Sequence, residues 1–251
     1  MFSEFFRRGA FVLAAGALAA LGLGLQAPAA RADALVLDSS VSALARGSEL
    51  KDGTRIEVPS GGSVTLLLPT GRTQTIKGPY AGAVRDVAKG EPLDKKLWRK
   101  VTELATGEGS DKPVGATRSV RPNVSKSVRP LQFAWNTIPL TAEDVLCLER
   151  DAPLELVRTN AMITQRAVIV DPKGGRAEII WPANTHTIPW PANLAKVDGG
   201  GYDLLLPDLP IRRFTLRLVD KKRTGATETV QTLYEGGCFE QLKLWLRTAG
   251  K

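Results

Sequence analysis

The stretch of sequence that decides the fold spans residues 165–182 and reads QRAVIVDPKGGRAEIIWP. Two apolar runs are joined in it by Asp171-Pro172-Lys173-Gly174-Gly175, and these residue types favour a tight turn. The stretch therefore predicts a β-hairpin.

Strand-like runs flank this hairpin from residue 131 to residue 220. LQFAW, VLCLE and PLELVR precede it, and TIPWP, GYDLLLP and RRFTLRLVD follow it. In the last run, Phe214, Leu216 and Leu218 alternate with polar residues. This alternation is typical of a strand that has one face in a core and the other in water. We therefore expect a β block over these residues.

An earlier block, residues 35–84, consists of short apolar runs that glycines interrupt. Ile56 and Val58 alternate with polar residues in one run, and SVTLLL at 63–68 is a more apolar run. Turn signals arrive about every 8–12 residues, which is the spacing of a β-sandwich, barrel or roll. This block is also expected to be β.

Two segments have helical spacing instead. Leu93, Leu97, Val101 and Leu104 fall on one stripe of a helix over residues 93–104. The C-terminal tail, residues 226–248, repeats this period, and Gly236-Gly237 divides it into two helices. The first helix is expected to cover the first β block and the tail to cover the second.

These patterns predict a mainly β protein with two small β domains. Residues 33–105 form the first domain with helix 93–104, and residues 131–251 form the second with its helical tail. Residues 106–130 are rich in Gly, Ser and Pro and predict a flexible linker. The linker is also basic, so it is either simply solvated or able to contact an anionic polymer.

Residues 1–32 have the features of an export signal. Arg7 and Arg8 precede an apolar run from Gly9 to Leu25, and both Ala30-Arg31-Ala32 and Ala32-Asp33-Ala34 fit a cleavage site. Cleavage after Ala32 lowers the net charge from +8 to +6. An uncleaved membrane anchor is the alternative, because the run is just long enough to span a bilayer. We expect a periplasmic or extracellular protein.

The two cysteines, Cys147 and Cys238, both follow the signal segment. An oxidising compartment favours a disulfide between them. Two buried free thiols are the alternative.

The first block resembles the periplasmic module of ferric-citrate-regulator (FecR)-type proteins. The resemblance rests on Gly47, Leu50, Gly53 and Ile56, on Gly62-Ser63-Val64-Thr65-Leu66, and on Gly71, about 40 of the 251 residues. It implies an extracytoplasmic β domain that relays a signal or binds a partner. Only eight residues precede the apolar segment in this sequence, where signalling members have a cytoplasmic domain, so we do not expect control of a sigma factor.

The second block resembles an immunoglobulin or fibronectin type III domain. IPWP, GYDLLLP and RFTLRLV supply a tryptophan strand, a tyrosine strand and a last alternating strand. The resemblance implies a β-sandwich and carries no activity.

Catalytic and cofactor patterns are sparse. The one histidine, His186, is the only candidate base for a serine or cysteine nucleophile. Ser48 and Lys51 match S-x-x-K, but its companion motifs are absent, and Cys238 at a helix start is a second candidate nucleophile. No metal, dinucleotide or nucleotide motif occurs. We expect no enzyme activity, no cofactor, no metal and no nucleic-acid partner.

The tetrapeptide Trp-Pro-Ala-Asn occurs twice, at 181–184 and at 190–193, with His186 between the copies. Trp181, His186 and Trp190 are therefore candidate binding residues, because two indoles can stack on a sugar or a cation. The alternative is that each Trp ends a strand by packing into the core and each Pro-Ala-Asn turns the chain.

The expected function is that of an exported, non-enzymatic envelope protein, a binding or signal-relay module that contacts another envelope component. The partner would be an envelope protein or a wall polymer. A cell-wall polysaccharide-binding or -processing protein is the alternative, and an enzyme that uses His186 or Cys238 is the third.

Overall fold

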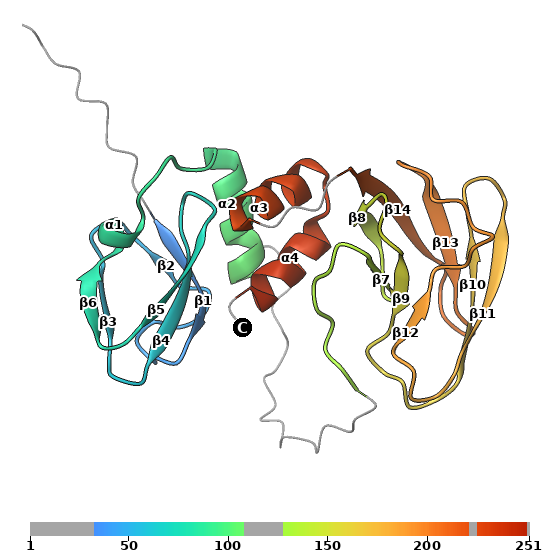
Figure 1. Ribbon diagram of the computed structural model, residues 1–251, viewed down its shortest axis with the longest axis horizontal. Helices are drawn as coiled ribbons and strands as arrows, with labels where there is room; N and C mark the ends of the chain where they lie inside the picture. The colour runs from blue at the N-terminus through green and yellow to red at the C-terminus, as the bar shows by residue number, and fades with distance from the viewer. Residues whose placement is uncertain (1–32, 108–127, 221–224, 250–251) are drawn as a thin grey trace, which may run out of the picture. The chain divides into compact units, whose positions relative to one another are not determined.

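The computed structural model describes residues 33–107, 128–220 and 225–249. These residues form fourteen strands and four helices, so the protein is mainly β, as predicted (Figure 1). The predicted export signal and most of the predicted linker lie outside the described residues. Within the described part of the chain, every helix is too short or too polar to cross a membrane.

The first β block contains two small sheets. The larger has the order β2-β1-β4-β5, with β1 at Ala34–Ser39, β2 at Glu49–Leu50, β4 at Ser63–Leu67 and β5 at Thr73–Lys77. The smaller pairs β3 (Arg55–Val58) with β6 (Tyr80–Ala83), which the short helix α1 (Val84–Val87) follows. Ile56 and Val58 are buried between the sheets with Val64 and Leu66, as the alternation predicts.

Helix α2 spans Lys95–Thr106. It begins two residues later than predicted, because the Asp94 carboxylate caps it by accepting hydrogen bonds from the backbone N–H groups of Lys96 and Leu97. It ends at Gly107, which has the left-handed conformation that glycine adopts at low cost. Leu97 and Val101 are buried on one face, as the helical period predicts.

The second β block is built from two sheets. The first has the order β11-β10-β13-β14-β8 and the second the order β12-β9-β7. Their strands are β7 (Thr137–Pro139), β8 (Asp144–Glu149), β9 (Glu155–Val157), β10 (Gln165–Val170), β11 (Arg176–Trp181), β12 (Thr187–Pro189), β13 (Gly201–Leu205) and β14 (Arg212–Val219). Ile138 and Leu156 of the small sheet share one core with Ile169, Leu204 and Leu216 of the large sheet. The block is therefore a β-sandwich.

The hairpin of residues 165–182 is present. Strands β10 and β11 pair from Gln165↔Trp181 to Val170↔Arg176. The Asp171 carboxylate closes the turn by accepting hydrogen bonds from the backbone N–H groups of Lys173 and Gly175. It also accepts one from Ala195, so the turn is fastened to a loop distant in sequence. These bonds, that of Ala195 first, lower the pKa of Asp171.

Tyr202, near the start of β13, binds the loop that contains Ala195 from inside the sandwich. Its hydroxyl donates to the Ala195 carbonyl at 2.6 Å and accepts from the Val197 N–H at 2.9 Å. Its ring stacks on Phe214 in the core. Burial is the main cause that raises the pKa of this phenol.

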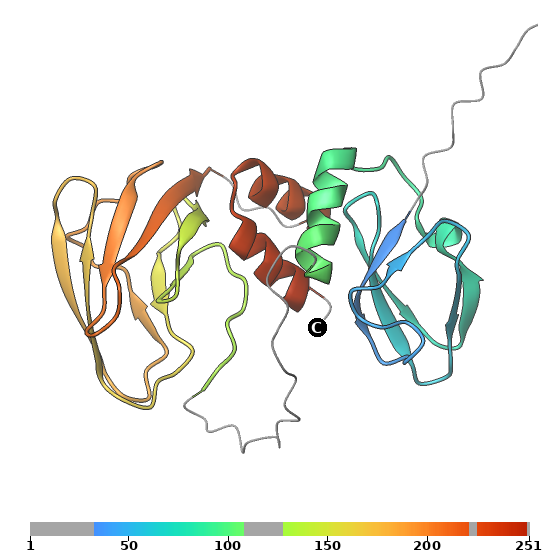
Figure 2. The same ribbon diagram turned by 180° about the vertical axis from the view of Figure 1, so that it is seen from behind.

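Helices α3 (Ala226–Glu235) and α4 (Phe239–Thr248) share a core with α2 (Figure 2). Val230 and Leu242 pack there with Leu97 of α2. Cys147 of β8 and Leu35 of β1 belong to the same cluster. The three helices thus pack together in one cluster, whereas the sequence led us to expect each helical segment to cover only its own β block.

Candidate binding face at one end of the sandwich

The two tryptophans that the sequence offers as candidate binding residues are buried or half-buried. Trp181, at the end of β11, is 0% exposed and lies in the sandwich core. Trp190, just after β12, is half-buried against the same core and packs edge-on against Tyr202. Its indole N–H donates to the Leu194 carbonyl at 3.2 Å. Trp181 packs into the core, as the alternative interpretation predicted, and has no surface left for stacking on a ligand, whereas Trp190 packs against the core and stays partly exposed.

His186 lies in the link between the two copies and is half-buried. Its Nδ1 lies 3.0 Å from the Arg158 carbonyl oxygen, so Nδ1 carries the hydrogen of this bond, because a carbonyl only accepts. The backbone N–H of Arg158 donates in turn to the backbone carbonyl of His186. Nε2 is buried and has no partner among the described residues. His186 therefore extends the pairing of β9 with β12.

Arg158 is a buried cation that sequence reasoning missed. It is 5% exposed. Its guanidinium donates to the carbonyl oxygens of Thr185 at 2.9 Å, Ile163 at 2.8 Å and Pro182 at 2.5 Å. The guanidinium carbon lies 5.4 Å from the centre of the Trp181 ring. Burial lowers its pKa. The first Trp-Pro-Ala-Asn copy thus forms part of a cage around this side chain.

The same cage fixes the loop of residues 158–164. Besides the Arg158 bond to the Ile163 carbonyl, the Asn184 N–H donates to the Ala161 carbonyl at 2.6 Å. The Ala183 N–H donates to the Thr164 hydroxyl at 3.3 Å. This loop is therefore held by hydrogen bonds at several successive residues.

The loop of residues 158–164 exposes apolar side chains to solvent. Met162 is 59% exposed and Ile163 is 71% exposed. Leu209 and Ile211, in the loop that joins β13 to β14, are 50% and 54% exposed. The register places both loops at one end of the large sheet. Val168 of β10 pairs with Leu205, the last residue of β13, so the start of β10 extends past that end, and Leu204 of β13 pairs with Arg212 at the start of β14. We call these four residues the apolar face.

A cavity of about 190 Å³ lies at this end of the sandwich. Leu140, Leu206 and Leu209 form part of its apolar lining, and the arginines Arg158 and Arg212 also line it. The guanidinium of Arg212 pairs with Glu143 at 3.0 Å. Its Nε is buried without a partner among the described residues.

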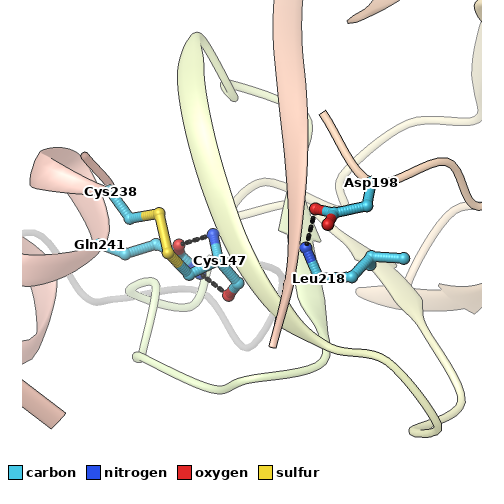
Figure 3. Close-up of a disulfide and its surroundings, with 5 residues drawn as sticks. All are labelled: Cys147, Asp198, Leu218, Cys238 and Gln241. Atoms are coloured by element: carbon cyan, nitrogen blue, oxygen red, sulfur yellow. Dashed lines mark hydrogen bonds between the residues drawn. A yellow bond between two sulfur atoms is a disulfide. The ribbon is translucent and has the colours of Figure 1, made fainter. Parts of the chain in front are cut away.

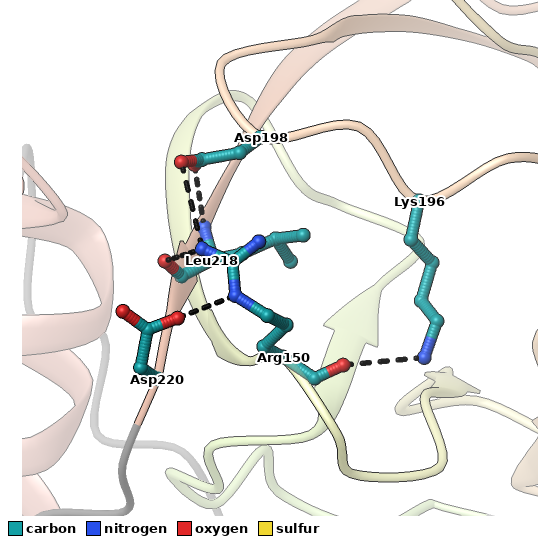
Figure 4. Close-up of polar contacts among 5 residues, drawn as sticks. All are labelled: Arg150, Lys196, Asp198, Leu218 and Asp220. Atoms are coloured by element: carbon teal, nitrogen blue, oxygen red, sulfur yellow. Dashed lines mark hydrogen bonds and ion pairs between the residues drawn. The ribbon is translucent and has the colours of Figure 1, made fainter.

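The opposite end of the sandwich is polar and closed by paired charges (Figure 4). The Arg150 guanidinium is hydrogen-bonded to the Asp220 carboxylate and lies 3.9 Å from that of Asp198. Asp198 also accepts a hydrogen bond from the Leu218 N–H at 2.8 Å. Arg150 is well exposed, and its pKa is raised mainly by the bond to Asp220. These groups fasten the loops of that end.

The two candidate nucleophiles are Cys238 and Ser48. Cys238 is bonded to Cys147 in the expected disulfide, and both are 0% exposed, so Cys238 is not a free thiol (Figure 3). Cys238 belongs to the helical core and His186 to the link between β11 and β12. Ser48 directly precedes the short strand β2, and Lys51 is an exposed residue directly after it.

No protein-family model, curated protein or solved structure matches the chain.

Sequence reasoning missed the apolar face because it searched for aromatic and reactive residues. The available signal was apolar residues inside turn-rich segments. Met162 and Ile163 stand in TNAMITQ, and Leu209 and Ile211 stand in PDLPIRR. Apolar side chains that gather in a turn-rich segment outside the strand alternation are candidates for an interface.

Proposed function

We propose that the protein is an exported, non-enzymatic binding protein of the cell envelope, and that it contacts another envelope protein through the apolar face. The observation that carries this proposal is that Met162 and Ile163 are more than half exposed on a loop fixed by Arg158. A loop held in one conformation loses little entropy on binding, and this favours affinity.

The paired charges at the start of β14 favour a protein partner over a lipid surface. Arg212 pairs with Glu143, and Arg213 pairs with Asp203 at 3.0 Å. Cations that are already paired give little attraction to anionic head groups, whereas apolar anchors with a polar rim are typical of protein interfaces. The export signal that the sequence predicts at residues 1–32 supports a partner in the envelope.

The proposed family relationships fit this role. The two-sheet arrangement of the second block supports an immunoglobulin-like domain. The hydroxyl of Tyr202, bonded to the backbone a few residues upstream, supports it further, because immunoglobulin-like domains carry such a tyrosine corner. The glycine-spaced strands of the first block support a FecR-like module.

Affinity capture from envelope extracts tests the proposal. The double variant Ile163→Ser, Leu209→Ser should lose a protein that the wild type retains. The control Arg176→Ser changes an exposed residue at the far end of the hairpin and should retain it. Retention of every specific partner by the double variant would contradict the proposal. Binding of phosphatidylglycerol vesicles that disappears in the same variant would instead assign the face to a membrane.

One observation favours the alternative function, recognition of a wall polysaccharide. A groove of about 430 Å³ is lined by residues that include Arg129, Gln132, Phe133 and His186. An aromatic ring, an amide and a cation are groups that bind carbohydrates. Sedimentation with purified peptidoglycan tests this function. Binding that is lost in Arg129→Ala, with the fold intact, would support it over the protein partner.

A further inference from the structure

Met162 differs in its chemistry from the other members of the apolar face. Ile163, Leu209 and Ile211 have purely hydrocarbon side chains, whereas Met162 carries a thioether sulfur. A thioether takes up an oxygen atom from a peroxide, and the apolar side chain becomes a polar sulfoxide, which enzymes can reduce again. One side chain of the apolar face can therefore lose and regain its apolar character after synthesis.

The fold keeps Met162 accessible to an oxidant. The residue is 59% exposed. Its backbone N–H donates to the side-chain oxygen of Asn160 at 2.9 Å, and the Arg158 guanidinium holds the next carbonyl, that of Ile163. Because the backbone is fixed on both sides of the residue, an oxidant reaches the side chain in the folded protein and does not need local unfolding.

Met162 is also the only exposed sulfur-containing residue among those that the structure describes. The other methionine of the chain, Met1, belongs to the predicted export signal. Cys147 and Cys238 are bonded to each other and 0% exposed, so neither offers a reactive thiolate. An oxidant that reacts with sulfur therefore finds one accessible target in the described part of the chain.

A sulfoxide at this position does not suit an apolar contact. Its oxygen is a hydrogen-bond acceptor, and burial of an acceptor without a donor costs free energy. The other three members of the apolar face are aliphatic and offer no side-chain donor. The backbone N–H of Met162 is already bonded to Asn160. A partner that covers the oxidised face would therefore bury an unpaired polar group.

We propose that Met162 is an oxidation switch on the apolar face. A lone pair of its sulfur attacks one oxygen of hydrogen peroxide, the O–O bond breaks and water leaves. Sulfur is thereby oxidised by two electrons and the peroxide is reduced. The sulfoxide weakens binding of the envelope partner until two thiols of a methionine sulfoxide reductase reduce it, with formation of a disulfide and water. The proposal rests on the proposed function, because binding of that partner is what oxidation changes.

Treatment of the full chain with hydrogen peroxide tests the site of oxidation. Peptide mapping by mass spectrometry should find one added oxygen atom on the peptide that contains Met162, and the disulfide should stay intact. Retention on a phenyl column should fall, because the apolar face becomes more polar, and the midpoint of thermal unfolding should stay the same, because the residue is more than half exposed. Met162→Leu keeps Met1 but lacks this sulfur, so peroxide should leave its retention on the column unchanged.

Affinity capture tests the effect on binding. The protein is oxidised, freed of peroxide and then exposed to an untreated envelope extract. It should retain at least about tenfold less of the envelope protein that the double variant Ile163→Ser, Leu209→Ser loses. Incubation with methionine sulfoxide reductases should restore the capture. Met162→Leu should retain equal amounts before and after peroxide treatment, whatever its own level of capture.

Absence of added oxygen at Met162, or an equal fall in column retention for Met162→Leu, would overturn the proposal. Equal capture by the oxidised and the untreated wild type would do the same. If the double variant still lost its partner in that case, the oxidation switch would be wrong and the proposed function would stand. Full retention of the partner by the double variant would overturn both.

Discussion

The side-chain amide of Gln241 binds both backbone groups of Cys147. Gln241 Oε1 accepts a hydrogen bond from the Cys147 N–H at 2.6 Å, and Nε2 donates to the Cys147 carbonyl at 3.1 Å (Figure 3). Strand β8 is the last strand of its sheet, so these groups have no neighbouring strand to pair with. Helix α4 therefore completes the edge of the sheet, and the Cys147–Cys238 disulfide fixes it at the same residue.

Gln241→Leu should destabilise the protein by about 2 kcal/mol, because it leaves a buried N–H and a buried carbonyl without partners. Leucine preserves the side-chain bulk, so the loss is one of hydrogen bonding. Urea unfolding of the oxidised protein measures the change, with Glu240→Gln as the exposed control one residue away. A loss of less than about 0.5 kcal/mol would show that water replaces the amide at this edge.

The disulfide should be present in the purified exported protein. Its intact mass should be lower by two hydrogen atoms than that of the reduced chain, and reducing agents should cleave the bond slowly in the folded protein because both cysteines are 0% exposed. The double variant Cys147→Ala, Cys238→Ala should lose roughly 2–5 kcal/mol of stability, because the bond closes a long loop. Two reactive thiols in the native protein would contradict the pairing.

The strands and helices were predictable because they follow the two simple hydrophobic periods. The alternation at Phe214, Leu216 and Leu218 and the helical stripe at Leu97 and Val101 both correspond to buried faces. The shared helical core was not predictable, because periodicity shows which face of an element is apolar and not which partner covers it. Strand β1 illustrates this point, since Ala34 and Val36 enter one core while Leu35 and Leu37 enter another.

The candidate site was less predictable than the fold. The sequence indicated the turns at 181–193 and their packed tryptophans, but not that Arg158 binds two carbonyls of that region together with the Ile163 carbonyl. A lone arginine after a strand has no local signature, because its partners come from segments up to 27 residues away. The exposure of Met162 and Ile163 likewise depends on how that cage orients the loop.

Tyr202→Phe should destabilise the sandwich by about 1–2 kcal/mol, because the Ala195 carbonyl and the Val197 N–H lose their shared partner. The ring and its stacking on Phe214 remain in this variant. Tyr234→Phe in helix α3 is the matched control. Thermal unfolding compares the two variants, and equal midpoints would show that the hydroxyl does not hold the loop.

The Asp171 carboxylate should make stability depend on pH in acid. Its pKa is lowered in the folded state, so the folded protein binds this proton less readily than the unfolded chain. The contribution is fully present above the unfolded pKa of about 3.9, and it disappears as pH falls through the lower folded value. Asp171→Asn should flatten the stability profile below about pH 4, whereas Asp208→Asn, an exposed control, should not. Identical acid profiles for wild type and Asp171→Asn would contradict this role.

Arg158→Lys should loosen the loop that carries the apolar face while leaving the charge in place. Lysine has one ammonium group and cannot reach the Thr185, Ile163 and Pro182 carbonyls together, as the planar guanidinium does. At least two carbonyls then lose a charged donor, and we expect a loss of about 2 kcal/mol or more.

Amide hydrogen exchange tests the loosening of the loop more directly than a loss of global stability does. The N–H of Asn184, which donates to the Ala161 carbonyl, should exchange faster in Arg158→Lys, because the cage no longer holds the two loops together. Amides of the β10–β11 hairpin turn, at the other end of the sheet, should keep their protection. Arg166→Lys, at an exposed position of β10, is the matched control. Unchanged exchange at Asn184 would mean that the loop keeps its shape without the arginine, and the argument that Met162 and Ile163 are held ready for a partner would then lose its basis.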